Sequence, residues 1–282
     1  MGDTHNTQKK TYIMALDQGT TSSRCILFDH AGKIVTMAQK EFTQIYPQPG
    51  WVQMNIDEFL NITVECMKKT VDAIKGKGYS PSDIAAVMGD GIICGICGVD
   101  KNGKAVTPYI NYLDSRTQAD VDAINAKNLD IWGRETGNPE ANCMFPAMFA
   151  RWFLANSEDF RQKGVKFVHN APYILMNLAG LKGEDAFIDW GAMSGWGLGY
   201  KVEKKEWSDE QLDILGIDKK YMPRILKPWD IVGGVSEEMA ARTGLVAGTP
   251  VCAGAGDTMQ SMLGSGAVSY THLRAHETGA YL

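Results

Sequence analysis

The stretch YIMALDQGTTSSRCILFD, residues 12–29, decides how the rest of the sequence is interpreted. Two short apolar runs, residues 12–16 and 24–28, flank the polar segment DQGTTSSR at residues 17–24. Apolar runs of this length, bounded by glycine and small polar residues, are typical of β-strands joined by a loop. A third apolar run follows at residues 34–38, after a turn at residues 29–32. The chain is therefore expected to open with three neighbouring strands.

Helical spacing begins after Asn55, where apolar residues recur from Ile56 to Ile74 until Gly76 and Gly78 close the segment. Strand and helix patterns then alternate, which predicts an α/β domain with a mixed sheet flanked by helices. The further strands are expected at residues 84–88, 165–169 and 249–255, with a hairpin turn at 100–103 that continues through 106–113. The further helices are expected at residues 118–126, 147–154, 173–178 and from 259 onward.

Composition narrows the classes of protein. The chain has 282 residues, of which 44% are hydrophobic and 22% charged, as in ordinary globular proteins. A net charge of -5 with scattered Lys and Arg argues against nucleic-acid binding. Residues 1–10 lack the apolar core of a signal peptide, and no apolar run reaches the roughly 18 residues of a membrane span. Together with six cysteines that lack disulfide-framework spacing, this predicts a cytoplasmic protein.

The polar segment at residues 17–24 has the composition of a nucleotide phosphate site. Gly19 allows the backbone to approach a phosphate, and Asp17 can hold Mg²⁺ through water. Hydroxyl donors are supplied by Thr20, Thr21 and Ser22. The alternative is that the same residues form an ordinary turn, for which they are also well suited.

Further residues add a family resemblance to this segment. Together with Phe28-Asp29, Gly32-Lys33 and QIYPQPGWV at residues 44–52, it resembles the opening of the FGGY carbohydrate kinases. The resemblance implies an actin-like, ribonuclease-H-like fold of two domains, with ATP and substrate in the cleft between them. It implies transfer of the γ-phosphoryl group to a primary hydroxyl. It also implies that the nucleotide phosphates face Thr20, Thr21, Ser22 and Arg24.

A second motif, GAGD at residues 254–257, is similar to the family segment that carries the catalytic aspartate at the start of the second domain. A carboxylate at the end of a strand is placed to take the proton of an attacking hydroxyl. We therefore expect Asp257 to be the general base. The structural alternative is that Asp257 caps a helix that begins near Met259.

The substrate residues depart from the glycerol kinases of the family. Those enzymes carry an Arg-Glu pair after the strand at residues 84–88, where this chain has GDGIIC at residues 89–94, and their substrate tyrosine falls near Met144. By contrast, YLDSR at residues 112–116 is similar to the pattern of xylulose-type kinases. The expected substrate contacts are Asp90, Gly91, Asp114 and Arg116.

Carboxylates accept hydrogen bonds from several sugar hydroxyls, so a ketopentose such as xylulose is favoured and glycerol is the alternative. For Asp114 and Arg116 the structural alternative is an N-cap and a first-turn ion pair on the following helix. A competing class of function is an actin-like ATP-binding module without sugar chemistry. A dinucleotide-dependent oxidoreductase is disfavoured because no G-x-G-x-x-G motif follows a strand.

The resemblance also divides the chain. We expect a tail at residues 1–10, the kinase N-terminal domain at 11–250, the start of a truncated second domain at 251–268 and a non-native tail at 269–282. Because FGGY kinases are considerably longer, we expect this chain to be inactive alone. The longer protein to which this chain would belong is expected to bind a small sugar or polyol, and a homo-oligomer is compatible with the family.

Overall fold

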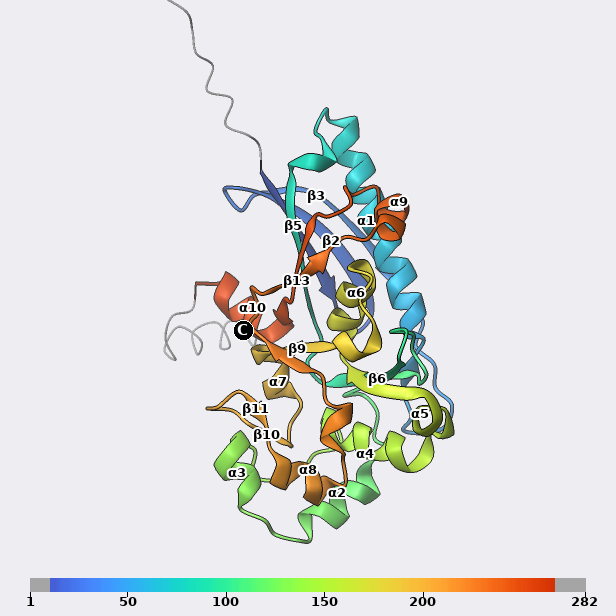
Figure 1. Ribbon diagram of the computed structural model, residues 1–282, viewed down its shortest axis with the longest axis vertical. Helices are drawn as coiled ribbons and strands as arrows, with labels where there is room; N and C mark the ends of the chain where they lie inside the picture. Colours follow the sequence, from blue (N-terminus) through green and yellow to red (C-terminus); the bar gives the residue numbers. More distant parts are fainter. Residues whose placement is uncertain (1–10, 267–282) are drawn as a thin grey trace, which may run out of the picture.

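The computed structural model describes residues 11–266, so the tails expected at 1–10 and 269–282 lie outside the described residues. Figure 1 shows an elongated body with a large sheet in its upper half and short helices in its lower half. Each half has its own cluster of buried apolar side chains. The segment at residues 11–250, expected to be one domain, therefore folds around two hydrophobic cores.

The large sheet contains seven strands in the order β13-β14-β5-β1-β2-β3, with β15 beside β5. β1 runs parallel to β5 and antiparallel to β2, which is in turn antiparallel to β3. The three opening strands and the mixed sheet are thus confirmed. The bounds are β1 (Tyr12–Gln18), β2 (Ser22–Asp29), β3 (Ile34–Glu41), β5 (Ile84–Gly91), β13 (Ile231–Gly234), β14 (Pro250–Cys252) and β15 (Ala255–Gly256).

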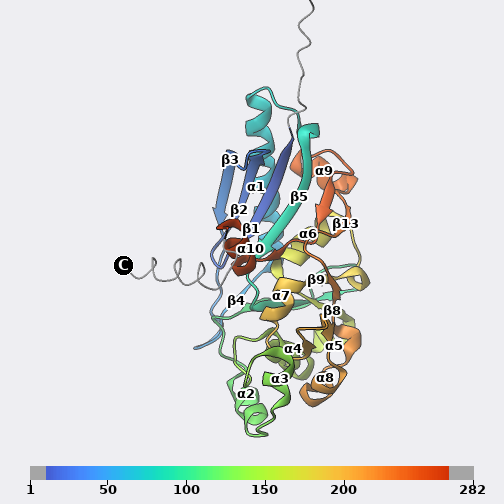
Figure 2. The same cartoon turned by 90° about the vertical axis from the view of Figure 1, so that its left-hand side faces the viewer.

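The two faces of this sheet differ because alternate residues of a strand point to opposite sides. In β1, Tyr12, Met14 and Leu16 are buried, whereas Ile13 and Ala15 are only partly buried. The buried face packs against α1 (Ile56–Gly76) and α6 (Asn170–Leu178), and α9 (Glu237–Thr243) packs beside α1. Figure 2 shows the other face, with α10 (Asp257–Gly264) in front of its lower end.

Helix α1 follows from its sequence. Asn55 is the N-cap, and its side chain accepts a hydrogen bond from the Asp57 amide at 3.0 Å. Satisfying an amide that has no partner within the helix typically stabilises a helix by about 1 kcal/mol. The apolar stripe expected from the spacing is buried, and Phe59 stacks on Phe42 of the segment after β3 with ring centroids 3.7 Å apart. This stripe anchors α1 to the sheet.

The lower half contains a four-stranded sheet in the order β4-β7-β6-β8. The helices predicted at residues 118–126 and 147–154 and the strand at 165–169 are confirmed within one or two residues. The sheet consists of β4 (Gln53–Met54), β7 (Tyr109–Asn111), β6 (Gly95–Asp100) and β8 (Gly164–Val168). Around it lie α2 (Gln118–Asn125), α3 (Ile131–Thr136), α4 (Pro146–Asn156), α5 (Glu158–Lys163), α7 (Trp190–Gly195) and α8 (Asp209–Leu215). Two small pairs, β9 (Phe187–Asp189) with β12 (Arg224–Leu226) and β10 (Tyr200–Lys201) with β11 (Glu206–Trp207), complete this half.

Two strand predictions need correction. The strand expected at residues 106–113 is limited to β7, because the chain after the turn makes only an isolated bridge between Val99 and Ala105. The strand expected at 249–255 is broken at Gly254, where φ is +73° and a Cβ atom would lie 1.9 Å from the Gly89 carbonyl oxygen. Only glycine fits that position.

The C-terminal strands bear on the expected domain division. Both β14 and β15 pair with β5 in parallel. The boundary expected between residues 250 and 251 therefore falls inside the large sheet. Among residues 11–266, no helix combines the length and apolarity needed to cross a membrane.

Candidate active site

Three carboxylates meet at one edge of the large sheet. Asp17 in β1 is the register partner of Asp90 in β5, and Ala255 in β15 is the partner of Asp90 on its other side. Asp257 follows β15 directly and is the first residue of α10. Because these three strands are parallel, their carboxyl ends lie together, which is where open α/β sheets bind ligands.

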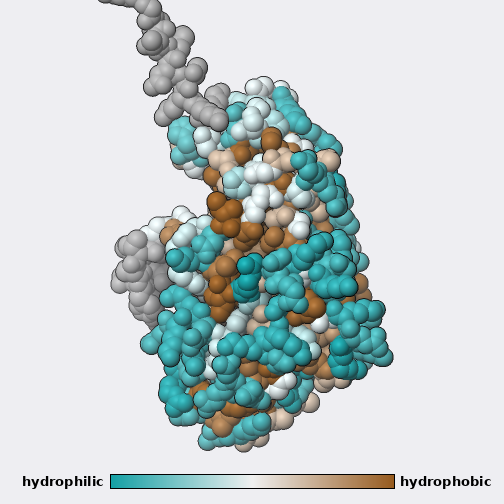
Figure 3. Space-filling model, viewed as in Figure 1, coloured by the Kyte–Doolittle hydropathy of each residue, from teal (hydrophilic) through white to brown (hydrophobic). Residues whose placement is uncertain are grey.

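A cavity of about 920 Å³ lies between the partly buried face of the sheet and α10. Figure 3 shows the hollowed left side of the molecule, where apolar side chains reach the surface. The volume is in the range of small-molecule sites, and the lining combines apolar walls with a few charged groups. The charged lining residues are Asp17, Arg24, Asp90 and Asp257, and the apolar ones include Ile26, Phe28, Met88 and Met262.

Asp90 has the least favourable environment for a charge among these three carboxylates. The pKa of Asp90 is raised to about 7, chiefly by burial and also by the nearby Asp17 and Asp257 charges, while Arg24 acts in the opposite direction. Its Oδ1 atom is buried and has no hydrogen-bond partner among residues 11–266. A buried acceptor without a partner costs about 1–3 kcal/mol. The carboxyl group of Asp90 is therefore well suited to a ligand that supplies hydroxyl donors.

Asp17 and Arg24 form an ion pair across the first two strands. Arg24 Nη1 lies 2.6 Å from Asp17 Oδ2, and the two residues are register partners. The Arg24 side chain is 41% exposed and also donates from Nε to Gln39. Both residues line the cavity, so the structure brings these two predicted site residues together. The pair offers a cation and a carboxylate side by side.

The expected phosphate loop is shorter than the motif. Residues 17–18 belong to β1 and 22–24 to β2, so only residues 19–21 form the turn. Gly19 lines the cavity, whereas the three predicted hydroxyl donors Thr20, Thr21 and Ser22 do not. Thr20 Oγ1 lies 2.8 Å from the Tyr112 hydroxyl, and Ser22 Oγ accepts from Gln39 Nε2 at 3.2 Å. Thr21 is exposed.

Asp257 lines the cavity at the start of α10, and its alternative interpretation as an N-cap is wrong. The N-cap is Gly256, and the Asp257 carboxylate accepts from the amide of the next residue, Thr258, at 2.6 Å. The reason is that β15 runs directly into the helix, so the helix begins two residues earlier than the apolar pattern indicates. The sequence did not predict the other α10 residues that line the cavity, which are Thr258, Gln260, Ser261 and Met262.

The predicted substrate residues Asp114 and Arg116 do not reach the cavity. Their side chains are 0% and 1% exposed and form an ion pair at 2.8 Å. The Arg116 guanidinium lies 3.9 Å from the ring centroid of Trp51 and 4.9 Å from that of Trp152. Asp114 also accepts from the Val52 amide at 2.6 Å. All of this binding capacity is used within the protein, so neither side chain is open to a substrate here.

The structural alternative for Asp114 and Arg116 is an N-cap and an ion pair at the start of the following helix. The ion pair is present, but the N-cap prediction is wrong. Helix α2 has Thr117 as its N-cap, not Asp114. Gly91, the remaining predicted substrate residue, ends β5 and is buried. A Cβ atom at Gly91 would lie 2.7 Å from Asn170 Oδ1. Close packing therefore accounts for this glycine.

The donor set fits a magnesium ion that is shared with a phosphate. Among residues 11–266, no group of three or more His, Cys, Asp or Glu is arranged to hold a metal by itself. Mg²⁺ in phosphoryl-transfer sites is usually bound by one or two carboxylates, water and the phosphates of the substrate. Asp17 and Asp257 supply carboxylates of this kind. Cys94 and Cys97, which are separated by two residues, are free, and burial raises the pKa of Cys94 to about 11, which disfavours thiolate ligation.

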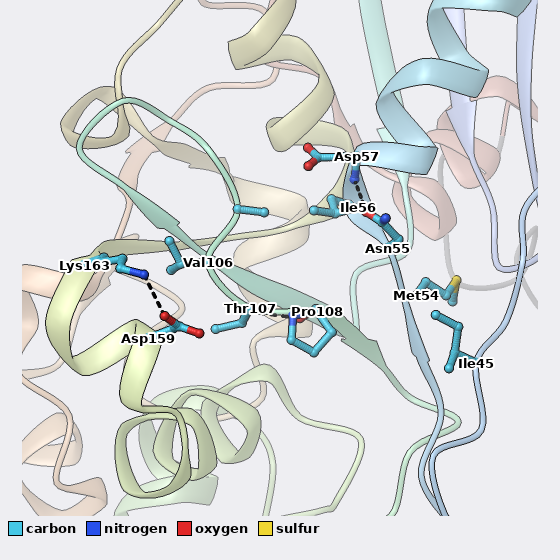
Figure 4. Close-up of a pocket in the computed structure, with 11 residues that line it drawn as sticks. Ile45, Met54, Asn55, Ile56, Asp57, Val106, Thr107, Pro108, Asp159 and Lys163 are labelled. Carbon is cyan, nitrogen blue, oxygen red and sulfur yellow. Dashed lines mark hydrogen bonds and ion pairs between the residues drawn. The ribbon is translucent and has the colours of Figure 1, made fainter.

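A second depression, of about 440 Å³, lies at the start of α1 and faces the lower sheet (Figure 4). Several of its polar groups are already bonded within the protein. The Asn55 side chain caps the Asp57 amide, and Lys163 pairs with Asp159 at 2.8 Å. It contains none of the predicted site residues. The carboxylate cavity is therefore the stronger candidate.

Comparison with known proteins bears on this site. The model of the FGGY family of carbohydrate kinases, N-terminal domain, matches residues 12–264. A glycerol kinase of Solidesulfovibrio magneticus is 33% identical over 263 residues, which cover 90% of this chain and 50% of that protein. The chain thus spans about half the length of this relative.

Solved structures agree in fold. A gluconate kinase from Lactobacillus acidophilus superimposes with a TM-score of 0.81 at 23% identity, covering 92% of this chain and 50% of that one. A ligand-bound xylulose kinase from the same organism gives 0.81 at 22% identity, covering 91% and 50%. The predicted mixed-sheet α/β fold is therefore the fold of these sugar kinases.

Proposed function

The chain belongs to the FGGY family of carbohydrate kinases, and from this premise we propose that its parent transfers the γ-phosphoryl group of ATP to a primary hydroxyl of a small sugar or polyol. The observation that carries the proposal is the convergence of Asp17, Asp90 and Asp257 on one cavity. Phosphoryl transfer depends mainly on positioning and on stabilising charge. This edge of the sheet supplies groups for both.

We assign the general base to Asp257. Its carboxylate takes the proton of the attacking hydroxyl, the hydroxyl oxygen forms a bond to the γ-phosphorus, and the bond from that phosphorus to the bridging oxygen breaks, so that ADP leaves. Arg24 and the turn at residues 19–21 lie near the expected phosphates. Asp17 would hold Mg²⁺ through water, and the ion would neutralise phosphate charge.

For the substrate we propose a ketopentose such as xylulose in preference to glycerol. The side chain of Ile93 packs closely against Gly195 and Gly256, in the segment where glycerol kinases carry their Arg-Glu pair. Cys94 donates to the Gly195 carbonyl at 3.7 Å. Residues 91–94 of this segment offer no charge to a small triol, whereas the Asp90 carboxyl lines the cavity and its Oδ1 atom has no partner among residues 11–266. An assay of the full-length protein with xylulose, other ketopentoses and glycerol tests the choice, and a higher kcat/KM for glycerol would refute it.

Asp257→Asn in the full-length protein tests the base. We expect it to bind substrate and to lose turnover by roughly 10²–10⁴-fold, because the base is removed while the shape is kept. Asp213→Asn, on the exposed surface of α8, is the matched control and should keep full turnover. Unchanged ADP formation by Asp257→Asn would remove Asp257 from the mechanism. The 282-residue chain alone should form no ADP, because closure around the substrate needs a second domain, which the resemblance to longer kinases implies.

A further inference from the structure

A hydrogen bond joins two segments that lie far apart in the sequence. Thr20 in the turn between β1 and β2 lies with its Oγ1 atom 2.8 Å from the hydroxyl of Tyr112, which directly follows β7. The Tyr112 side chain is 38% exposed, so core packing alone does not explain its position. The contact connects the expected phosphate turn to the lower half of the molecule.

The chemistry of hydroxyl groups indicates which of these two residues donates the hydrogen bond. A threonine hydroxyl has one proton to donate and two lone pairs, and phosphate oxygens of ATP only accept. If Thr20 donates to a phosphate, its oxygen must be the acceptor in the bond with Tyr112. Resting on the kinase function proposed above, we propose that Tyr112 is a positioning residue that donates its phenol proton to Thr20 and directs the Thr20 proton toward the nucleotide.

The two neighbouring hydroxyl residues, Thr21 and Ser22, make different contacts. Ser22 accepts from the Gln39 amide and lies in β2, pointing toward β3. Thr21 is exposed, and its carbonyl oxygen accepts from the Phe42 amide at 2.8 Å. Within the turn at residues 19–21, the hydroxyl of Thr20 is the one that is bonded to a side chain from the lower half of the molecule.

The buried pair behind Tyr112 keeps its segment in place. The Arg116 guanidinium lies against the rings of Trp51 and Trp152, and Asp114 accepts a hydrogen bond from the Val52 amide. The Ser115 amide donates to the Gly50 carbonyl at 2.9 Å. These contacts fasten the segment after β7 to the loop before β4. Asp114 and Arg116, expected from the sequence to touch substrate, thus hold in place the segment that carries Tyr112.

Tyr112→Phe in the full-length enzyme removes the hydroxyl and keeps the ring. We expect kcat/KM for ATP to fall about 3- to 10-fold, which corresponds to the loss of one hydrogen bond in a network. Thr20→Val should have a similar or larger effect, and the double variant should be no worse than Thr20→Val. Thr20→Ser, which keeps the hydroxyl, should restore most of the activity. KM for the sugar and the melting temperature should stay unchanged. Additive losses, or no loss in Tyr112→Phe, would overturn the proposal.

A second measurement does not depend on turnover. In the 282-residue chain without nucleotide, hydrogen exchange of the amides at residues 19–22 should be several-fold faster in Tyr112→Phe, because the turn loses its tether. Unchanged exchange would overturn the positioning role. If the unmodified full-length enzyme formed no ADP with any sugar or polyol, the kinase proposal would fail, while this exchange result would still decide the Tyr112 contact.

Discussion

Asp90 and Asp114 are both aspartates that the sequence assigns to substrate, and the protein surrounds them in opposite ways. Asp114 is fully buried, pairs with the Arg116 side chain and accepts hydrogen bonds from the backbone amides of Val52 and Arg116. Asp90 faces a cavity beside two other carboxylates and has an oxygen without a partner. A carboxylate whose bonds are all made inside the protein stabilises architecture. One that is left incomplete retains binding capacity for a ligand.

Removing the partner of Asp114 should give the largest effect on stability. In Arg116→Met the Asp114 charge stays buried without its counter-ion, which typically costs 3–5 kcal/mol. Denaturant unfolding of the 282-residue chain measures this loss. Arg134→Met, which breaks an exposed ion pair with Asp130, should cost roughly 0.5 kcal/mol or less. Equal losses of unfolding free energy in the two variants would contradict the prediction that burial makes the Asp114–Arg116 pair more costly to break.

Neutralising Asp90 should have a smaller effect of the opposite sign. The pKa of Asp90 is raised from 3.8 to about 7, so the folded state keeps a proton that the unfolded state loses. The free energy of unfolding contributed by this group is therefore present below pH 4 and is lost as the pH rises through 7. Asp90→Asn should be more stable than the parent at pH 8, by on the order of 1–2 kcal/mol, and should lack this decline.

The pH series needs a matched control. Asp213→Asn, at an exposed position of α8, should follow the parent at every pH. Thermal unfolding between pH 4 and 8 compares the three proteins. A decline of the same size in Asp90→Asn and the parent would show that another group causes it.

The smallest predicted effects concern the neighbours of Asp90. Asp17→Asn removes a like charge and should lower the pKa of Asp90, whereas Arg24→Gln removes an opposite charge and should raise it. Because the Asp17–Arg24 pair is partly exposed, either change should alter the free energy of unfolding by about 1 kcal/mol or less. Carboxyl carbon chemical shifts followed by NMR report the titration. Shifts of the same sign in both variants would contradict the assigned electrostatics.

Much of the fold was predictable because it follows from local patterns. The period of two in β1 and β2 and the 3.6-residue period of α1 depend on neighbours within a few residues. In the structure Asp17 and Arg24 share one face, and the alternation of β2 signals two lining residues that were not predicted, Ile26 and Phe28, which lie on the face of Arg24. The break at Gly254 was not predictable, because its cause is the close approach of Gly89, 165 positions earlier along the chain.

The sequence by itself determined the family, the opening strands and the presence of aspartates at strand ends. Only the tertiary structure decided which of these aspartates are satisfied. The partners of Asp114 include Val52, and the partner of Thr20 is Tyr112, so these pairings depend on how distant segments pack. Periodicity reports whether a side chain is turned inward, but the free energy of a buried charge depends on the groups that surround it. For that reason the motif at residues 112–116 could not reveal that Asp114 and Arg116 are buried and bonded to each other.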